Sequence, residues 1–189
     1  MMASPKLCDE AALSELVAAL ESGAKDDLER TDRLIAQYPD DGRLHLLRAS
    51  MLMEIGRSIE ALPAFRKAVE LAPDFALARF QLGFFLLTSG DAAEALSVWG
   101  PLALFPADHY LRLFVGGLTY LIRDEFTDSV RLLREGIAAN EENLPLNRDI
   151  ALIIEQVEHL GALPSSPGTG EEVSATSVLL GQFAPRRIH

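Results

Sequence analysis

Cysteine, aromatic residues and positive charge are all scarce in this chain of 189 residues. Cys8 is the only cysteine, so no intramolecular disulfide can form, which is consistent with a reducing compartment. Aromatic residues make up 7% of the chain, and its many Ala and Leu residues favour helix over strand. Lysine and arginine number 17 against 28 acidic residues, which leaves a formal net charge of −11. Because such a surface repels phosphate, we expect neither nucleic-acid binding nor attraction to an anionic membrane.

Long apolar runs are missing as well. Asp9, Glu10 and Glu15 come before any apolar stretch develops, whereas a secretory signal has a basic start and an uninterrupted apolar stretch. The apolar run near residues 102–105 is far too short to cross a bilayer. We therefore expect a cytoplasmic protein without membrane insertion.

No group of residues in the sequence has the spacing of a catalytic or metal site. The four histidines are scattered and Cys8 has no partner cysteine. Gly116 and Gly117 lie in a helical pattern, and the glycine spacing of nucleotide-binding loops does not occur. We predict no enzyme activity, no cofactor and no bound metal.

An internal repeat with a period of 34 residues is the strongest signal in the sequence. Small residues, bulky residues and turn residues each recur at this interval. The four sets are Ala49, Gly83 and Gly117; Ala61, Ala95 and Ser129; Phe65, Trp99 and Leu133; and Gly56, Gly90 and Asp124.

These residues resemble the tetratricopeptide repeat (TPR), in which small residues sit where the two helices of a repeat approach each other. The resemblance implies an all-α fold, a tetratricopeptide-repeat right-handed superhelix of antiparallel helix pairs with a C-terminal capping helix. The resemblance covers residues 8–160. It divides them into a degenerate first repeat 8–41, repeats 42–75, 76–109 and 110–143, and a capping helix 144–160.

The pattern has a physical basis in helix packing. Small side chains on both helices allow a close approach, and a bulky residue such as Trp99 fills the space beside them. Gly56 and Gly90 are expected to end the first helix of their repeats in a left-handed conformation. Pro73 is expected to end a second helix.

A few residues depart from the family pattern. Arg48 replaces a large apolar residue, and Glu15 and Asp27 occupy positions where small residues are usual. Gly100-Pro101 falls inside a predicted second helix and should kink or end it. Pro63 also falls inside a predicted second helix, and we expect it to disturb that helix less.

In the TPR family the first helix of each repeat lines a concave groove, and the resemblance implies which side chains line it here. Most are apolar, which indicates a site for an extended or helical peptide with apolar anchors. The groove residues are Leu46, Met53, Leu77, Phe80, Phe84, Leu87, Leu111, Phe114, Leu118, Leu121 and Ile122. The alternative is that these residues pack only against neighbouring helices. The polar residues with which chaperone-binding members hold a peptide carboxylate are mostly Leu and Phe here.

The C-terminal region differs in composition. Residues 161–172 are rich in turn-forming residues and are predicted to be a flexible linker. Residues 173–189 form a tail that contains Val178, Leu179, Leu180 and Phe183. Two interpretations remain open: a disordered terminus, or a segment that docks in a groove of its own chain or of a neighbour.

The favoured function is a non-enzymatic protein–protein interaction scaffold that binds an apolar peptide. A second hypothesis rests on similarity to the chaperones of type III secretion translocators. A third is a self-associating protein whose tail fills its own or a neighbour's groove, so a homo-oligomer is possible.

Overall fold

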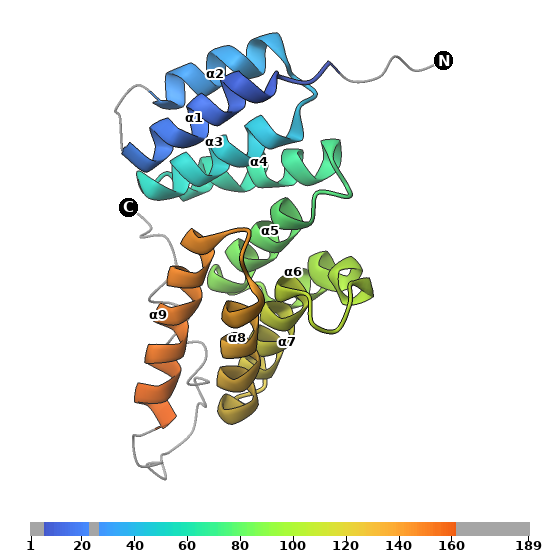
Figure 1. The fold of residues 1–189 in the computed structure, drawn as a ribbon, viewed down its shortest axis with the longest axis vertical. Coiled ribbons are helices and arrows are strands. Elements are labelled where there is room, and N and C mark those ends of the chain that lie inside the picture. The colour runs from blue at the N-terminus through green and yellow to red at the C-terminus, as the bar shows by residue number, and fades with distance from the viewer. Residues whose placement is uncertain (1–5, 23–26, 162–189) are drawn as a thin grey trace. The chain divides into compact units, whose positions relative to one another are not determined.

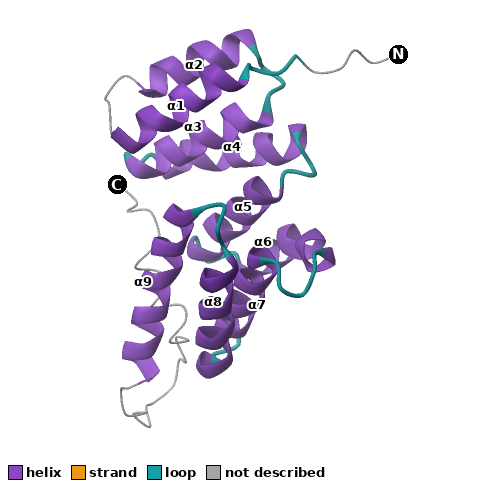
Figure 2. Cartoon of the chain, in the orientation of Figure 1, coloured by secondary structure: helices purple, strands orange, loops and turns teal. Residues whose placement is uncertain are grey.

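The computed structural model describes residues 6–22 and 27–161, and within these ranges the chain is entirely helical (Figures 1 and 2). The helices are α1 (Glu10–Ser22), α2 (Asp27–Gln37), α3 (Gly42–Glu54), α4 (Ser58–Leu71), α5 (Ala76–Thr88), α6 (Ala92–Trp99), the 3-10 helix η1 (Gly100–Leu104), α7 (Tyr110–Ile122), α8 (Phe126–Ala139) and α9 (Leu144–Gly161). The helices follow one another in consecutive pairs, which confirms the predicted all-α fold built from helix pairs. The right-handed superhelix stays a prediction.

The turns within three of the helix pairs repeat the sequence period in their backbone conformation. Gly56 and Gly90 have φ values of 76° and 93°, so both adopt the predicted left-handed conformation. Asp124, which stands where a third glycine would be, has φ of 58°. Asp adopts this left-handed region more readily than most residues with a side chain, so the turn between α7 and α8 has the same conformation without glycine.

Proline acts differently at its two helical positions. Helix α6 ends at Trp99, and Gly100-Pro101 begins the 3-10 helix η1, as the sequence predicts. Pro63, in contrast, lies inside α4, which continues from Ser58 to Leu71. Its place in the second turn of the helix leaves most of the helical hydrogen bonds intact.

Packing divides the described residues into two units, one up to Leu82 and one from Gly83 onward, and each is treated separately. In the first unit α3 packs along α4, and α2 packs on α3. Its N-terminal core contains the buried side chains of Cys8, Leu16, Leu44 and Met51.

In the second unit α7 packs along α8, and α9 covers another side of α8 (Figure 1). A Cβ atom on Gly117 would lie 2.7 Å from Leu133 and 3.1 Å from the carbonyl oxygen of Ser129. The small residue on one helix therefore faces the small and bulky residues of the other, as the repeat pattern requires. Gly83 approaches Trp99 in the same way, and Trp99 is fully buried.

Helix α9 is amphipathic. Its buried side chains recur every three or four residues and are Leu146, Ile150, Ile153, Ile154 and Val157. Charged residues such as Arg148, Glu155 and Glu158 occupy its exposed side. The helix runs from Leu144 to Gly161, and its role as the cap of a repeat array stays a prediction.

Candidate peptide-binding face

The eleven predicted groove residues all lie on α3, α5 and α7, the helices predicted to come first in their repeats. In the first unit they are Leu46 and Met53 on α3, and Leu77 and Phe80 on α5. In the second unit they are Phe84 and Leu87 on α5, and Leu111, Phe114, Leu118, Leu121 and Ile122 on α7.

Burial separates these residues into two groups. Seven are buried, with exposed fractions of 5% or less: Leu46, Phe80, Leu87, Leu111, Phe114, Leu118 and Leu121. Met53, Leu77, Phe84 and Ile122 are half-buried. Only the second group offers surface to a ligand, since the first group is already packed against protein. Whether a peptide binds this face stays a prediction.

Phe114 shows how a predicted groove residue can belong to the interior of its own helix pair. A Cβ atom on Gly136 of α8 would lie 2.5 Å from the Phe114 ring. The ring also meets Tyr110 edge-on, with 5.9 Å between the ring centroids. Phe114 therefore packs within the α7–α8 pair and is not an exposed anchor.

Polar side chains near this face are satisfied within the chain. The hydroxyl of Ser50 on α3 lies 3.2 Å from the carbonyl oxygen of Leu46 and 3.3 Å from Oε1 of Gln81 on α5, so it can donate to either acceptor. Thr88 donates back to the preceding turn, 3.0 Å from the carbonyl oxygen of Phe84. Because these polar groups already have hydrogen-bond partners, a ligand would bind here mainly through apolar contacts.

Arg43, near the start of α3, is held in a partly buried polar cluster. Its Nε donates to Oδ1 of Asp41 at 3.0 Å, and its Nη2 donates to Oδ2 of Asp41 and to the carbonyl oxygen of Cys8, both at 2.8 Å. Its Nη1 donates to Glu10. The guanidinium is therefore occupied by partners of its own chain, which argues against a clamp for a peptide carboxylate at this position.

The carboxylate of Asp41 is the centre of that cluster and is fully buried. It accepts hydrogen bonds from the backbone N–H groups of Cys8 at 2.9 Å and Arg43 at 3.0 Å, and it caps the N-terminus of α3. Burial alone would raise the pKa of Asp41, but the hydrogen bonds from Arg43 and Cys8 and the charge of Arg43 lower it below its ordinary value. The same contacts raise the pKa of Arg43. The pair is thus ionised at neutral pH.

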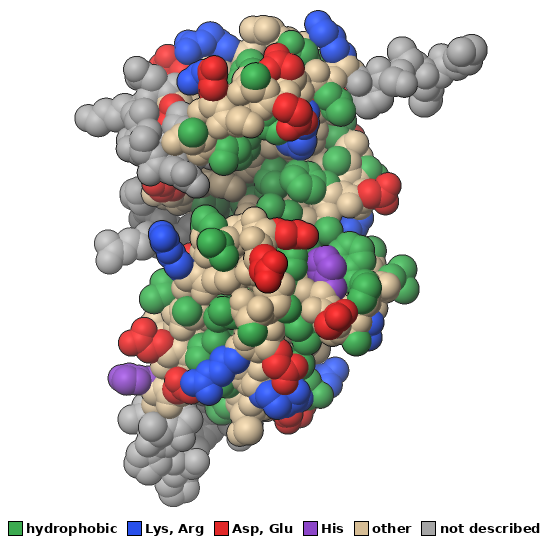
Figure 3. Space-filling view, in the orientation of Figure 1, with side chains coloured by type: hydrophobic (Ala, Val, Ile, Leu, Met, Phe, Trp, Pro, Cys, Tyr) green, Lys and Arg blue, Asp and Glu red, His purple; other side chains and the backbone are tan. Residues whose placement is uncertain are grey.

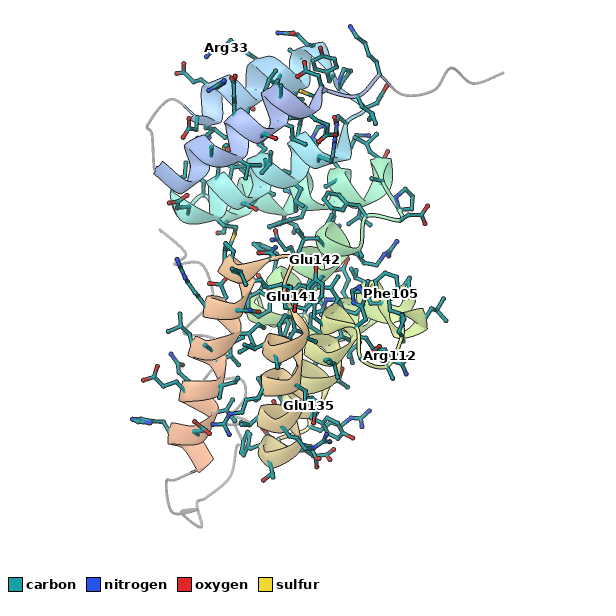
Figure 4. All side chains as sticks on the ribbon, viewed as in Figure 1. Arg33, Phe105, Arg112, Glu135, Glu141 and Glu142 are labelled. Carbon is teal, nitrogen blue, oxygen red and sulfur yellow. The ribbon has the colours of Figure 1, made fainter. Side chains whose placement is uncertain are left out.

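An aromatic corner lies at the start of α7 in the second unit. The ring centroids of Phe105 and His109 are 4.4 Å apart, and those of His109 and Tyr110 are 4.9 Å apart. Arg112 donates to the carbonyl oxygen of Phe105 at 2.6 Å, and Figure 4 shows the two residues side by side. Burial, with a contribution from nearby Glu142, raises the pKa of Tyr110 to about 12. Tyr110 is therefore a neutral phenol at all ordinary pH values, and the corner serves packing.

The predicted docking residues Val178, Leu179, Leu180 and Phe183 lie outside the described residues. Within residues 6–22 and 27–161, no three His, Cys, Asp or Glu side chains are grouped so as to hold a metal ion. None of the described helices is both long enough and apolar enough to cross a membrane.

Comparison with known proteins gives a partial similarity. Over 57 residues the chain is 40% identical to DnaJ homolog subfamily C member 3 of Rattus norvegicus. The similarity covers 30% of this chain and 11% of that protein, so the chain spans only a small part of the length of this relative. No protein-family model matches the chain, and no solved structure matches it.

Sequence reasoning missed two polar contacts that shape the first unit. Nε of Arg48 donates to Oδ1 of Asp32 at 2.7 Å, which explains why a charged residue is tolerated at a usually apolar position. The cluster around Asp41 joins residues 33 and 35 positions apart in the chain. Asp is a favoured N-cap residue, so an Asp directly before a predicted helix is the local signal from which the role of Asp41 could have been found.

Proposed function

We propose that this chain is a TPR-type scaffold that binds an apolar peptide segment of another protein and carries out no chemistry itself. The observation that supports the proposal is the recurrence, at one sequence interval, of a left-handed turn at Gly56, Gly90 and Asp124. Close helix contacts at Gly83 and Gly117 follow the same interval. Arrays of this kind hold their helices rigidly and present one face for recognition.

Each unit offers a ligand surface of its own, formed by the half-buried members of the predicted groove in that unit. These are Met53 and Leu77 in the first unit, and Phe84 and Ile122 in the second. Each would bury its remaining apolar surface against a ligand side chain, and this burial supplies the binding free energy. The acidic exterior favours ligands with basic residues beside the apolar anchors.

The partial similarity to a DnaJ homolog supports protein partners in general. The secretion-chaperone and tail-exchange hypotheses stay open alternatives, and no contact of the described residues favours either over a general scaffold.

The test is selection of peptides from a random display library on the purified full-length chain. We expect enrichment of sequences with Leu, Ile, Met or Phe at intervals of three or four residues. A peptide that binds the first unit should bind at least tenfold more weakly to Met53→Glu, and a peptide that binds the second unit should do so with Ile122→Glu, with helicity unchanged by circular dichroism.

Two exposed apolar residues away from this face provide matched controls. Ile59 on α4 is 85% exposed and Leu104 of η1 is 87% exposed. Ile59→Glu and Leu104→Glu should bind as the wild type does. If all four variants bind equally well, the peptide does not use the proposed face, and if no peptide is enriched, the scaffold function itself is wrong.

A further inference from the structure

A groove of about 600 Å³ lies between α8 and α9 in the second unit, apart from all eleven predicted groove residues. Its apolar wall is formed by Phe126 and Val130 on α8 and Val157 on α9. Val157 is 1% exposed, whereas Phe126 and Val130 are half-buried. A volume of this size is within the range, about 300–1,000 Å³, of sites that hold small ligands or a few side chains.

The rim of the groove carries charges of both signs. Arg134 pairs with Glu158 at 2.7 Å across the two helices, and Arg131 pairs with Glu135 at 3.0 Å along α8. Figure 4 shows Glu135 on α8, and Figure 3 shows acidic and basic side chains next to one another over this unit. These side chains are 48–61% exposed, so their pairs contribute little and can exchange partners at low cost.

We propose that residues 178–183 of the same chain dock in this groove. Val178, Leu179, Leu180 and Phe183 match its apolar wall, and Leu179 and Phe183 have the spacing that puts two anchors on one side of a helical turn. Glu171-Glu172 precedes this apolar group and Arg186-Arg187 follows it, so charges on both flanks can pair with the mixed rim.

The connection to α9 makes the groove easy to reach. Val157 lies one helical turn before Gly161, where α9 ends, which is about 6 Å along the helix axis. The chain from Gly161 to Val178 can extend over as much as about 60 Å at 3.3–3.6 Å per residue. A linker of this kind holds the tail at an effective concentration on the order of millimolar, so even a modest apolar contact suffices.

A nitroxide label at the groove provides the test in the full-length protein. Thr127 lines the groove and is exposed, so Thr127→Cys gives an attachment site beside the proposed tail position. The native Cys8 is 3% exposed, and burial raises the pKa of its thiol, so it should not react. We expect the label to broaden the amide NMR signals of residues 178–183 equally at two protein concentrations tenfold apart.

Three results would overturn the proposal. One is the absence of broadening from Thr127→Cys. Another is broadening that appears only at the higher concentration, which identifies a second copy as the source. The third is equal broadening from a label at Ile59→Cys on α4, which would mean that the tail samples the surface at random.

A matched pair of tail variants tests the apolar contact without touching the helical core. Leu180→Glu should abolish the broadening, whereas Gln182→Glu adds the same charge two residues away and should keep it. Equal behaviour of the two variants would contradict apolar docking. None of these outcomes depends on peptide binding by the face proposed above, since the groove shares no residue with it.

Discussion

The N-terminal end of the first unit and the α7–α8 pair of the second unit join their helices by different chemistry. Residues before and at the start of α1 are attached to α3 through the ionised pair of Asp41 and Arg43. Helices α7 and α8 instead meet through Gly117 and Gly136, each of which receives a large apolar side chain from the other helix. Both arrangements bring helices together, but the first adds an ion pair to an apolar core, whereas the second depends on the fit of apolar side chains against glycine.

The comparison shows what each repeat requires from its sequence. A repeat that keeps small residues at the helix contact needs no polar group there, so its packing should be insensitive to pH and salt. Residues 8–41 have Glu15 and Asp27 where the predicted repeat would have small residues, and the long-range polar contacts of Asp41 and Arg43 with Cys8 add to their apolar core.

Removal of the Asp41 carboxylate should weaken the N-terminal attachment more than any other single change considered. Asp41→Ala removes a helix cap and leaves the Cys8 N–H and the Arg43 guanidinium without their main acceptor, at a combined cost of about 3 kcal/mol. Urea unfolding and hydrogen exchange of residues 8–22 measure the loss. Asp40→Ala, at an exposed neighbouring residue, is the control and should change stability little. Equal stability of the two variants would contradict the role of the cluster.

The α7–α8 contact should respond to a single methyl group. In Gly117→Ala the new Cβ would lie 2.7 Å from Leu133, and overpacking should cost about 2 kcal/mol. In Gly116→Ala the Cβ meets only the end of Leu132 at 3.0 Å, so the higher helix propensity of Ala should offset the contact. The difference between these adjacent variants in thermal unfolding is the measurement. If Gly117→Ala proves as stable as Gly116→Ala, the contact is looser than the structure shows.

The pH dependence of stability should differ between the wild type and Asp41→Asn. Because the folded pKa of Asp41 is lowered, its ionised form contributes stability above its unfolded pKa of about 3.9, and this contribution is lost as the pH falls through the folded pKa. The stability difference between the two proteins should therefore be constant from neutral pH to about pH 5 and shrink below it. Chemical unfolding at a series of pH values tests this. A constant difference down to the lowest pH would show that the pKa of Asp41 is not lowered.

At the left-handed turns, the cost of replacing glycine should come from backbone strain and not from a steric clash. A Cβ on Gly90 would touch nothing within 4 Å, but φ there is 93°, so Gly90→Ala should cost about 1 kcal/mol through strain. Ser89→Ala, at the exposed preceding residue, should be nearly neutral. Denaturant midpoints of the two variants give the comparison, and equal midpoints would mean that the turn rearranges freely.

The exposed ion pair between Arg30 and Glu15 should have the smallest effect. The two atoms are 2.7 Å apart, but the side chains are 41% and 69% exposed, so Glu15→Gln should cost about 0.5 kcal/mol or less. That small loss should vanish at high salt, because exposed pairs are screened. A larger loss that persists in high salt would show that Glu15 has a structural role beyond this pair.

The sequence predicts the helix pairs well because the signals for them are local or strictly periodic. The left-handed turn at Gly56 and the helix end at Gly100-Pro101 each depend on residues within one turn of the chain. Contacts such as that of Gly117 with Leu133 follow from the period, because a small residue and a bulky residue meet at the same interval in each helix pair.

The candidate site is less predictable. The family pattern treats Phe114 and Ile122 alike, yet Phe114 is fully buried against Gly136 while Ile122 is half-buried. The groove between α8 and α9 could not be predicted from the 34-residue period. Its shape depends on how α9 packs along α8, and α9 lies outside the repeating pattern.

The sequence by itself determined that this chain forms consecutive helix pairs, because a fixed interval of small, bulky and turn residues allows only close helix packing. Only the tertiary structure decided which apolar side chains remain available to a ligand. Exposure is set by elements distant in the chain, and the same holds for the contacts of Arg43 with Cys8 and of Arg48 with Asp32. A periodic pattern specifies the face on which a residue lies, whereas the neighbours that cover that face follow from the folded chain.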